Sequence, residues 1–392
     1  MSSVVIDHQF MARALQLAAQ GLYTTHPNPR VGCVIVRAGE IVGEGWHVRA
    51  GEPHAEIHAL AQAGTRARGA TVYVTLEPCC HYGRTAPCVD ALIEAGVARV
   101  VVAMIDPDPR VAGQGLARLV AAGIATESSV LQTQAEALNA GFITRMRERR
   151  PWVRCKLAMS MDGRTALPSG ESKWVTSEAA RQDVQHLRAS SAAILTGIGT
   201  VLADDPALTV RSVAPQGVPS SDHAVRQPLR VVVDSWLRTP PQARLLKEPG
   251  HTLIVTTTQD RVSSEKLVCD KVTVNVQPDR HDRMAAGNRA TPGAVAHGGV
   301  DLVALMQTLA MDYEINDVLV EAGPILNGAL LSAGLMDEVI IYMAPHLMGD
   351  AARGLFHLPG LQQMSQRVAL DVQDIRAVGR DWRISAKVMR NN

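Results

Sequence analysis

Aromatic residues and a net charge are what this sequence lacks. Phe, Trp and Tyr together make up 3% of 392 residues, and 39 basic residues against 38 acidic ones leave a formal net charge of +1. A protein that binds along nucleic acid needs a basic excess, and one that holds single strands adds aromatic side chains for the bases. We therefore expect no nucleic-acid partner.

The chain also has few cysteines and no long apolar run. Six cysteines in this length do not make a disulfide framework. The chain has no run of about 18 apolar residues, so we expect no membrane span. The N-terminus lacks the basic and apolar stretches of a secretory signal. These absences favour a cytoplasmic protein, in which cysteines stay reduced and available as thiolate ligands.

Strands alternate with helices along most of the chain, an order that indicates an α/β architecture. At 392 residues the chain is too long for one ordinary core, so we expect two domains. In the first part of the chain the patterns predict strands over 31–36, 41–46, 71–76 and 97–105, and helices from Asp7 and over 54–63, 85–95 and 115–122.

The charged segment Arg145–Arg150 precedes Pro151, and we place the domain boundary in this region. The first domain then spans residues 1–148 and the second spans residues 149–392. The second is predicted to contain strands over 153–159, 192–196, 230–234, 253–257, 317–321 and 338–343, helices over 178–189 and 325–333, and two surface insertions over 212–226 and 278–299.

One nitrogen and two sulfur ligands stand in a pattern typical of zinc deaminases. Glu56 follows His54 by two residues, and Glu77-Pro78-Cys79 is followed by Cys88. An imidazole and two thiolates suit a tetrahedral Zn²⁺ and leave its fourth position open for water. Glu56 can then carry protons between that water and a substrate. Both ligand segments fall at strand-to-helix junctions, where open α/β sheets bind ligands.

A structural zinc site with four protein ligands is the alternative for these residues. Cys80, His81 or His58 could each supply the fourth ligand. A structural site has no need of an acid two residues from its histidine, which favours the catalytic interpretation. Residues two apart on a helix point about 200° away from each other. His54 and Glu56 can therefore reach one water only at the beginning of the helix.

The second domain has no G-x-G-x-x-G after a strand, so a Rossmann cofactor site is not supported. Two other glycine-containing turns do follow predicted strands, over 196–200 and 321–324. Backbone N–H groups and a helix N-terminus at such turns can hold an anion. From these residues alone, an ordinary tight turn is the better explanation of each.

Further motifs extend the pattern over nearly the whole chain. They are Pro27-Asn28-Pro29-Arg30-Val31-Gly32-Cys33-Val34, Gly83-Arg84-Thr85-Ala86-Pro87-Cys88, Lys156-Leu157, Ser160-Met161-Asp162-Gly163-Arg164, and the segments 169–176, 204–211 and 321–324. With these motifs the chain resembles the bifunctional riboflavin biosynthesis deaminase/reductase family.

This resemblance implies a cytidine-deaminase-like α/β/α sandwich followed by a dihydrofolate-reductase-like α/β domain. It implies zinc-dependent hydrolytic deamination of a small pyrimidine ribotide, 2,5-diamino-6-(5-phosphoribosylamino)pyrimidin-4-one. NADPH then reduces the ribosyl group to ribityl, giving 5-amino-6-(5-phosphoribitylamino)uracil. The sequence is also compatible with a homo-oligomer.

The resemblance also implies roles for single residues. Asn28 contacts the substrate of the deaminase. The residues around NADPH are Ala158, Trp174, Thr200, Asp204, Ser235, Gly323, Pro324, Ile325, Leu326, Asn327, Gly328 and Ala329. Those around the ribosyl-phosphate substrate are Ser172, Arg188, Leu208, Arg211 and Glu321.

The residue types suit these roles. Arg188 and Arg211 offer bidentate donors to a phosphate, and Glu321 can accept hydrogen bonds from ribose hydroxyls. The family often has Asp-Pro-Asn-Pro where this chain has Asp106-Pro107-Asp108-Pro109. An ionised Asp only accepts hydrogen bonds, whereas Asn also donates them, so Asp108 is left out of the predicted site.

Two other functions compete with this interpretation. One is a nucleic-acid base deaminase fused to an accessory domain, which the balanced charge and the scarcity of aromatic residues disfavour. The other is a zinc-stabilised scaffold without enzyme activity. The acid at position 56 is the feature that separates an enzyme from such a scaffold.

Overall fold

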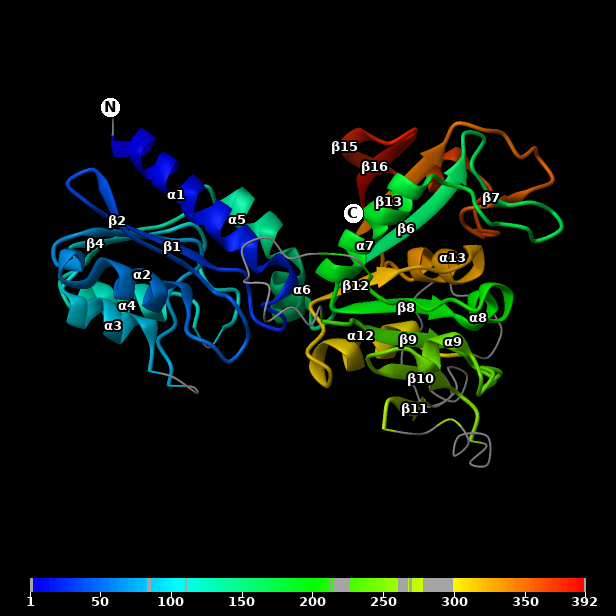
Figure 1. The fold of residues 1–392 in the computed structure, drawn as a ribbon, viewed down its shortest axis with the longest axis horizontal. Coiled ribbons are helices and arrows are strands. Elements are labelled where there is room, and N and C mark those ends of the chain that lie inside the picture. The colour runs from blue at the N-terminus through cyan, green and yellow to red at the C-terminus, as the bar shows by residue number, and fades with distance from the viewer. Residues whose placement is uncertain are drawn as a thin grey trace. The chain divides into compact units, whose positions relative to one another are not determined.

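The computed structural model describes residues 3–82, 86–109, 111–211, 213, 226–259, 267, 270–277 and 299–390. The described chain forms two compact units, one ending at Arg150 and the other beginning at Pro151 (Figure 1). Each unit has its own sheet and its own hydrophobic core.

The first unit is a five-stranded sheet with helices on both faces (Figure 1). Its strand order is β2-β1-β3-β4-β5, in which β1 is antiparallel to β2 and β3, and β3, β4 and β5 are parallel. The strands are β1 (Gly32–Arg37), β2 (Glu40–Trp46), β3 (Thr71–Val74), β4 (Arg99–Val102) and β5 (Ala125–Glu127). The helices are α1 (Ser3–Ala19), α2 (Ala55–Ala63), α3 (Cys88–Ala95), α4 (Gln114–Ala121), α5 (Gln132–Leu138) and α6 (Ala140–Glu148).

Side chains of β1 alternate between two hydrophobic cores, as a pleated strand requires. Cys33 and Ile35 pack with α2, α3 and α4, whereas Val34 and Val36 pack with α1, α5 and α6. Because both faces are covered, the strand reads as a continuous apolar run.

Glycine at the start of β1 allows α1 to lie directly on the sheet. A Cβ atom added at Gly32 would come within 2.0 Å of the Ala14 carbonyl oxygen and 2.6 Å of the Ala18 nitrogen. Both of these atoms belong to the backbone of α1, so no side-chain rotation can relieve the overlap.

We predict that Gly32→Ala lowers the free energy of unfolding by about 1–3 kcal/mol, since overpacking of this kind costs that much. Urea unfolding of the two proteins measures the change. Gly360→Ala is the matched control, because nothing lies within 4 Å of a Cβ atom built there. An unchanged midpoint for Gly32→Ala would show that α1 does not depend on this contact.

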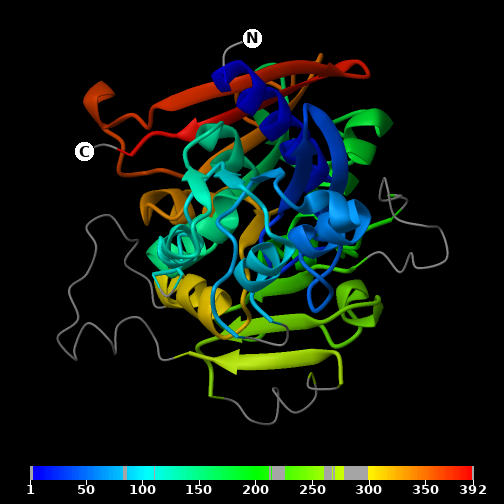
Figure 2. The ribbon, with the colours of Figure 1, turned by 90° about the vertical axis from the view of Figure 1, so that its left-hand side faces the viewer.

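The second unit contains a nine-stranded mixed sheet of order β11-β10-β9-β8-β12-β6-β13-β16-β15. Figure 2 shows β11 at one edge of this sheet and the β15–β16 hairpin at the other. The strands are β6 (Trp152–Ser160), β8 (Ala193–Gly197), β9 (Leu229–Val233), β10 (Thr252–Thr256), β11 (Val272–Val276), β12 (Asp317–Val320), β13 (Glu338–Ala344), β15 (Leu370–Val378) and β16 (Asp381–Val388), with β7 (Arg164–Ala166) and β14 (Arg353–Gly354) in a small separate sheet.

Helices cover both faces of the large sheet. On one face α7 (Glu178–Ser190), α8 (Ile198–Asp204) and α9 (Arg244–Lys247) pack on residues such as Ile194 and Val232. On the other face α12 (Leu302–Met311) and α13 (Pro324–Ser332) pack on residues such as Leu195. The strands from β11 to β13 are all parallel, so their carboxyl ends meet at one edge of the sheet.

Most predicted strands and helices coincide with observed ones, and the differences have physical reasons. The hairpin of β15 and β16 was missed because β15 is exposed and its alternation of apolar and polar residues is broken at the register shift between Val372 and Asp374. No helix was predicted for the charged segment before Pro151, where Arg145–Glu148 forms the last turn of α6. The predicted insertions over 212–226 and 278–299 lie almost wholly outside the described residues.

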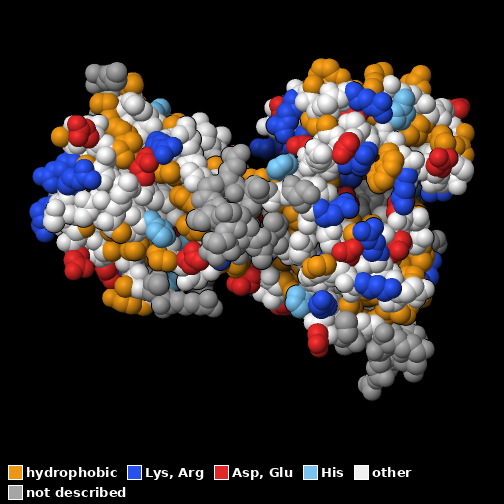
Figure 3. Space-filling view, in the orientation of Figure 1, with side chains coloured by type: hydrophobic (Ala, Val, Ile, Leu, Met, Phe, Trp, Pro, Cys, Tyr) orange, Lys and Arg blue, Asp and Glu red, His pale blue; other side chains and the backbone are white. Residues whose placement is uncertain are grey.

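Basic and acidic side chains are interspersed on the face drawn in Figure 3. Across the described part of the chain, no helix is both long and apolar enough to cross a membrane.

Candidate active sites

His54, Cys79 and Cys88 come together in the first unit, although 34 positions separate the outermost two in the chain. The Cys79 and Cys88 sulfurs lie 3.6 Å and 3.3 Å from His54 Nδ1. One ligand atom from each residue lies within 4.8 Å of the others, and no further His, Cys, Asp or Glu of the described residues joins them. Of the expected alternatives for a fourth ligand, Cys80, His81 and His58 are therefore all outside the group.

Local backbone structure places the three ligands. His54 is the N-cap of α2, with extended dihedral angles (φ −76°, ψ 167°), and Cys88 is the first residue of α3. Because His54 is not helical, the 200° rotation between helical residues two apart does not apply. Glu56, in the first turn of α2, lies against the Cys88 sulfur and is 3% exposed.

The donor atoms of this group suit a bound cation. Hydrogen bonds from Cys88 and His54 lower the pKa of Cys79 to about 4, while hydrogen bonding to Cys79 and burial raise the pKa of Cys88. Two neighbouring thiolates repel each other unless a cation lies between them, and Zn²⁺ prefers this N,S,S donor set. Burial raises the pKa of Glu56 to about 7, which suits a group that gains and loses a proton near neutrality.

Asn28 reaches the same site through a histidine that the sequence analysis did not single out. Asn28 Nδ2 lies 3.0 Å from His47 Nε2, and His47 Nδ1 lies 3.2 Å from the Pro53 carbonyl oxygen. The His47 ring meets the His54 ring edge-on, with centroids 5.3 Å apart. Burial lowers the pKa of His47, so its neutral ring can accept from Asn28 while donating to Pro53.

A buried carboxylate holds the loop that carries Cys79. Glu77 is 3% exposed and accepts hydrogen bonds from four backbone N–H groups, those of Asp106, Gly113, Gly115 and Leu116. Gly115 and Leu116 belong to the first turn of α4, where the helix dipole also favours a negative charge. Glu77 thus ties the end of β3 to α4 and positions the residues after it.

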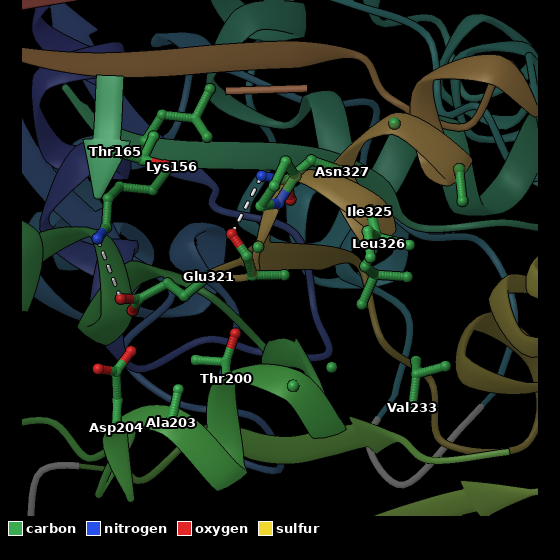
Figure 4. Close-up of a pocket in the computed structure, with 18 of the residues that line it drawn as sticks. Lys156, Thr165, Thr200, Ala203, Asp204, Val233, Glu321, Ile325, Leu326 and Asn327 are labelled. Carbon is green, nitrogen blue, oxygen red and sulfur yellow. Dashed lines mark hydrogen bonds and ion pairs between the residues drawn. The ribbon is translucent and has the colours of Figure 1, made fainter. Parts of the chain in front are cut away.

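The second unit contains a cavity of about 1840 Å³ at the carboxyl ends of its parallel strands (Figure 4). All the residues predicted around the cofactor line it: Ala158, Trp174, Thr200, Asp204, Ser235 and the run Gly323, Pro324, Ile325, Leu326, Asn327, Gly328 and Ala329. The predicted substrate residues Ser172, Arg188, Leu208, Arg211 and Glu321 line it too. The structure therefore brings together residues from segments about 170 positions apart.

Glu321 is held ionised at the centre of this cavity by two cations. Arg188 Nε and Nη2 lie 2.6 Å and 3.0 Å from its carboxylate oxygens. Lys156 Nζ lies 3.3 Å from the same carboxylate (Figure 4). Burial alone would raise the pKa of Glu321, but Arg188 and Lys156 lower it to about 2. Arg188 also donates to the Thr209 carbonyl oxygen, so most of its guanidinium is occupied. Arg211 is exposed and makes no ion pair among the described residues.

The residues around α8 and α13 suit a dinucleotide. Gly199 and Gly323 line the cavity, and a Cβ atom at either would meet nothing within 4 Å, so the backbone there is open to a ligand. Asn327 is 1% exposed and donates to the Ala322 carbonyl oxygen, while its Oδ1 finds no donor among the described residues. An unpaired buried acceptor is costly, so a ligand hydroxyl or amide would stabilise it.

Lys156 lines this cavity and pairs with Glu321, but it has no role among the residues predicted from the sequence. It stood in a quoted motif, but a lysine within an apolar strand gives no sign of its partner. Only the parallel pairing of β6 with β12 puts its ammonium beside Glu321.

Comparison with known proteins identifies a known domain in each half of the chain. A family model described as the cytidine and deoxycytidylate deaminase zinc-binding region matches residues 5–104, and one described as the RibD C-terminal domain matches residues 151–384. The protein is thus a zinc-binding deaminase domain joined to a reductase domain, whose fold is of the dihydrofolate reductase type.

Single proteins of known sequence or structure match both domains over nearly the whole chain. The riboflavin biosynthesis protein RibD of Escherichia coli is 51% identical over 96% of this chain and 97% of its own, and that of Haemophilus influenzae is 46% identical over 97% and 96%. A solved structure of Acinetobacter baumannii RibD has a TM-score of 0.86 at 43% identity and covers 99% of this chain and 100% of its own. The chain belongs to the RibD family, the bifunctional deaminase/reductases of riboflavin biosynthesis.

We predict that Glu77→Gln weakens zinc binding by about tenfold, because an amide N–H₂ would face backbone N–H groups and loosen the loop before Cys79. Competition with a chelator measures the zinc affinity. Glu94→Gln, an exposed change on α3, is the control. Equal zinc affinity in Glu77→Gln and the wild type would refute the positioning role.

Proposed function

We propose that the first unit deaminates 2,5-diamino-6-(5-phosphoribosylamino)pyrimidin-4-one and that the second reduces the ribosyl group of the product with NADPH. A solved Thermotoga maritima structure described as a diaminohydroxyphosphoribosylaminopyrimidine deaminase/5-amino-6-(5-phosphoribosylamino)uracil reductase is 30% identical, has a TM-score of 0.82 and covers 99% of this chain and 100% of its own. The observation that carries the proposal is the pairing of a three-ligand N,S,S group with a separate cavity suited to a dinucleotide.

In the deaminase, His54, Cys79 and Cys88 would hold zinc. Zinc supplies a Lewis acid that makes water nucleophilic at neutral pH. Glu56 accepts the proton that the water loses, then delivers protons to the ring nitrogen and to the amine that leaves as ammonia. Asn28, oriented by His47, binds the pyrimidine ring.

In the reductase, NADPH supplies the hydride that turns the ribosyl group into ribityl. The turns at Gly197–Thr200 and Gly323–Asn327 hold the cofactor through backbone N–H groups and helix N-termini. Glu321 accepts hydrogen bonds from ribose hydroxyls, and Arg188 and Lys156 keep it ionised for that task. Arg211, whose guanidinium makes no ion pair with any residue that the structure describes, binds the substrate phosphate.

The two rival functions have less support. The described residues offer the zinc group no fourth ligand, which a structural site would use. A nucleic-acid deaminase would need a basic surface, whereas charges are mixed on the face drawn in Figure 3.

We expect Glu56→Gln to keep its zinc and fold while losing deamination by about 10² to 10⁴-fold, because the amide cannot accept a proton. Ammonia release from the diaminopyrimidine ribotide, with metal content measured on the same sample, checks this. Reduction of the deaminated product by the same variant serves as the internal control. Normal ammonia release would contradict the role given to Glu56.

We expect Arg211→Ala to raise the KM for the ribosyl-phosphate substrate by about tenfold and to leave NADPH affinity unchanged, because a charged hydrogen bond to phosphate is worth about that factor. Steady-state reduction and cofactor titration separate the two effects. Arg380→Ala, an exposed change outside the cavity, is the control. Equal weakening of both ligands would count against the phosphate assignment.

A further inference from the structure

Arginines at the reductase cavity fall into two groups. Arg188 and Arg244 are each paired with a glutamate, Glu321 and Glu248 respectively. Arg181, Arg211, Arg238 and Arg353 also line the cavity, and among the described residues their guanidinium groups make no ion pair; that of Arg181 donates to the Thr176 carbonyl oxygen and lies over the Trp174 ring. An unpaired guanidinium beside a ligand cavity is suited to an anionic group of the ligand.

Arg238 lies at the end of the cavity opposite the reacting groups. It follows β9, whereas Lys156 belongs to β6, and β8 and β12 separate these two strands. Three steps between neighbouring strands amount to about 14 Å. In Figure 4, Val233 at the end of β9 is across the cavity from Lys156, with Thr200 and Glu321 between them.

The residues at the two ends of the cavity decide where the nicotinamide and the adenosine of a bound dinucleotide lie. The nicotinamide must meet the sugar that it reduces, near Lys156 and Glu321. The pyrophosphate falls between the two ends, at the N-terminus of α13, which follows β12, and at the open backbone of Gly199, which follows β8. The adenosine ribose then lies beyond β8, beside Ser235 and Arg238.

Asp234 and Asp301, the acidic residues considered for this end of the cavity, accept hydrogen bonds from other groups of the protein. Asp234 is fully buried and is not part of the cavity lining; its Oδ2 accepts hydrogen bonds from the Thr239 N–H and hydroxyl groups, while its buried Oδ1 has no partner among the described residues. Asp301 is the N-cap of α12 and accepts from the backbone N–H groups of Val303 and Ala304. An NADH site uses a carboxylate on the ribose 2′-hydroxyl, whereas an NADPH site uses an arginine on the 2′-phosphate. This end of the cavity offers the arginine.

We propose that Arg238 binds the adenosine 2′-phosphate and makes the reductase select NADPH over NADH. The inference rests on the proposed reductase function and adds to it the residue that decides between the two cofactors. Arg211 and Arg353 are assigned elsewhere, because Arg211 joins α7 through Gln185 and Arg353 lies beside Gly170 on the small sheet.

The test measures binding of two probes to the zinc-loaded full chain by calorimetry, adenosine 2′,5′-bisphosphate and 5′-AMP. They differ only in the 2′-phosphate. In Arg238→Ala, affinity for the bisphosphate should fall by about tenfold or more while affinity for 5′-AMP stays unchanged. Arg238→Lys should keep part of the preference, since it retains the charge but not the fork of donors. The ratio of kcat/KM for NADPH to that for NADH should fall in parallel.

Arg244→Ala is the matched control, because it removes a charge from the same cavity but one already paired with Glu248. Deaminase activity of each variant verifies its folding. Unchanged bisphosphate affinity in Arg238→Ala, equal loss of both probes, or a selective loss in Arg244→Ala instead would overturn the proposal. A wild type that binds both probes equally would overturn it as well, and would also remove the NADPH preference from the proposed function.

Discussion

Parallel strands bring their carboxyl ends to one edge of a sheet, and both active sites depend on this constraint. In the first unit β3 ends just before Glu77 and Cys79, and the neighbouring strand β4 leads to the loop of Asp106. In the second unit the ends of β8, β9 and β12 surround the cavity, and β6 runs past the end of β12. Helix N-termini lie at the same edges, so each site also gains backbone donors and favourable dipoles.

Buried carboxylates perform different tasks in the two units. Glu77 is satisfied by four backbone N–H groups and serves to shape a loop. Glu321 is satisfied by the side chains of Arg188 and Lys156, which leave it next to open space. A carboxylate buried without such partners would take up a proton, and neither task would then be possible. The groups that hydrogen-bond to a buried carboxylate thus decide whether it stabilises a loop, as Glu77 does, or stays available to a ligand, as Glu321 does.

Glu56 illustrates a third arrangement, in which a carboxylate has few stabilising partners and its pKa rises toward neutrality. Zinc deamination requires a group that changes protonation during the reaction, whereas ribose binding requires one that stays ionised. The pKa of Glu56 near 7 and that of Glu321 near 2 match these different demands. In the proposed mechanism, the chain obtains proton transfer and hydrogen-bond acceptance from the same residue type by varying its surroundings.

Local patterns in the sequence predicted most strands and helices and the three candidate zinc ligands with Glu56, which the structure brings together, because period-2 and period-3.6 hydrophobicity and ligand spacing are properties of short segments. Motif resemblance added the residues of the reductase cavity. Tertiary structure alone decided which groups meet: Lys156 with Glu321, His47 with Asn28, and Glu77 with α4. It also decided that the candidate zinc group has no fourth ligand among the described residues. These contacts join segments between 19 and 165 positions apart, and strand pairing and helix packing, which no short segment encodes, bring them together.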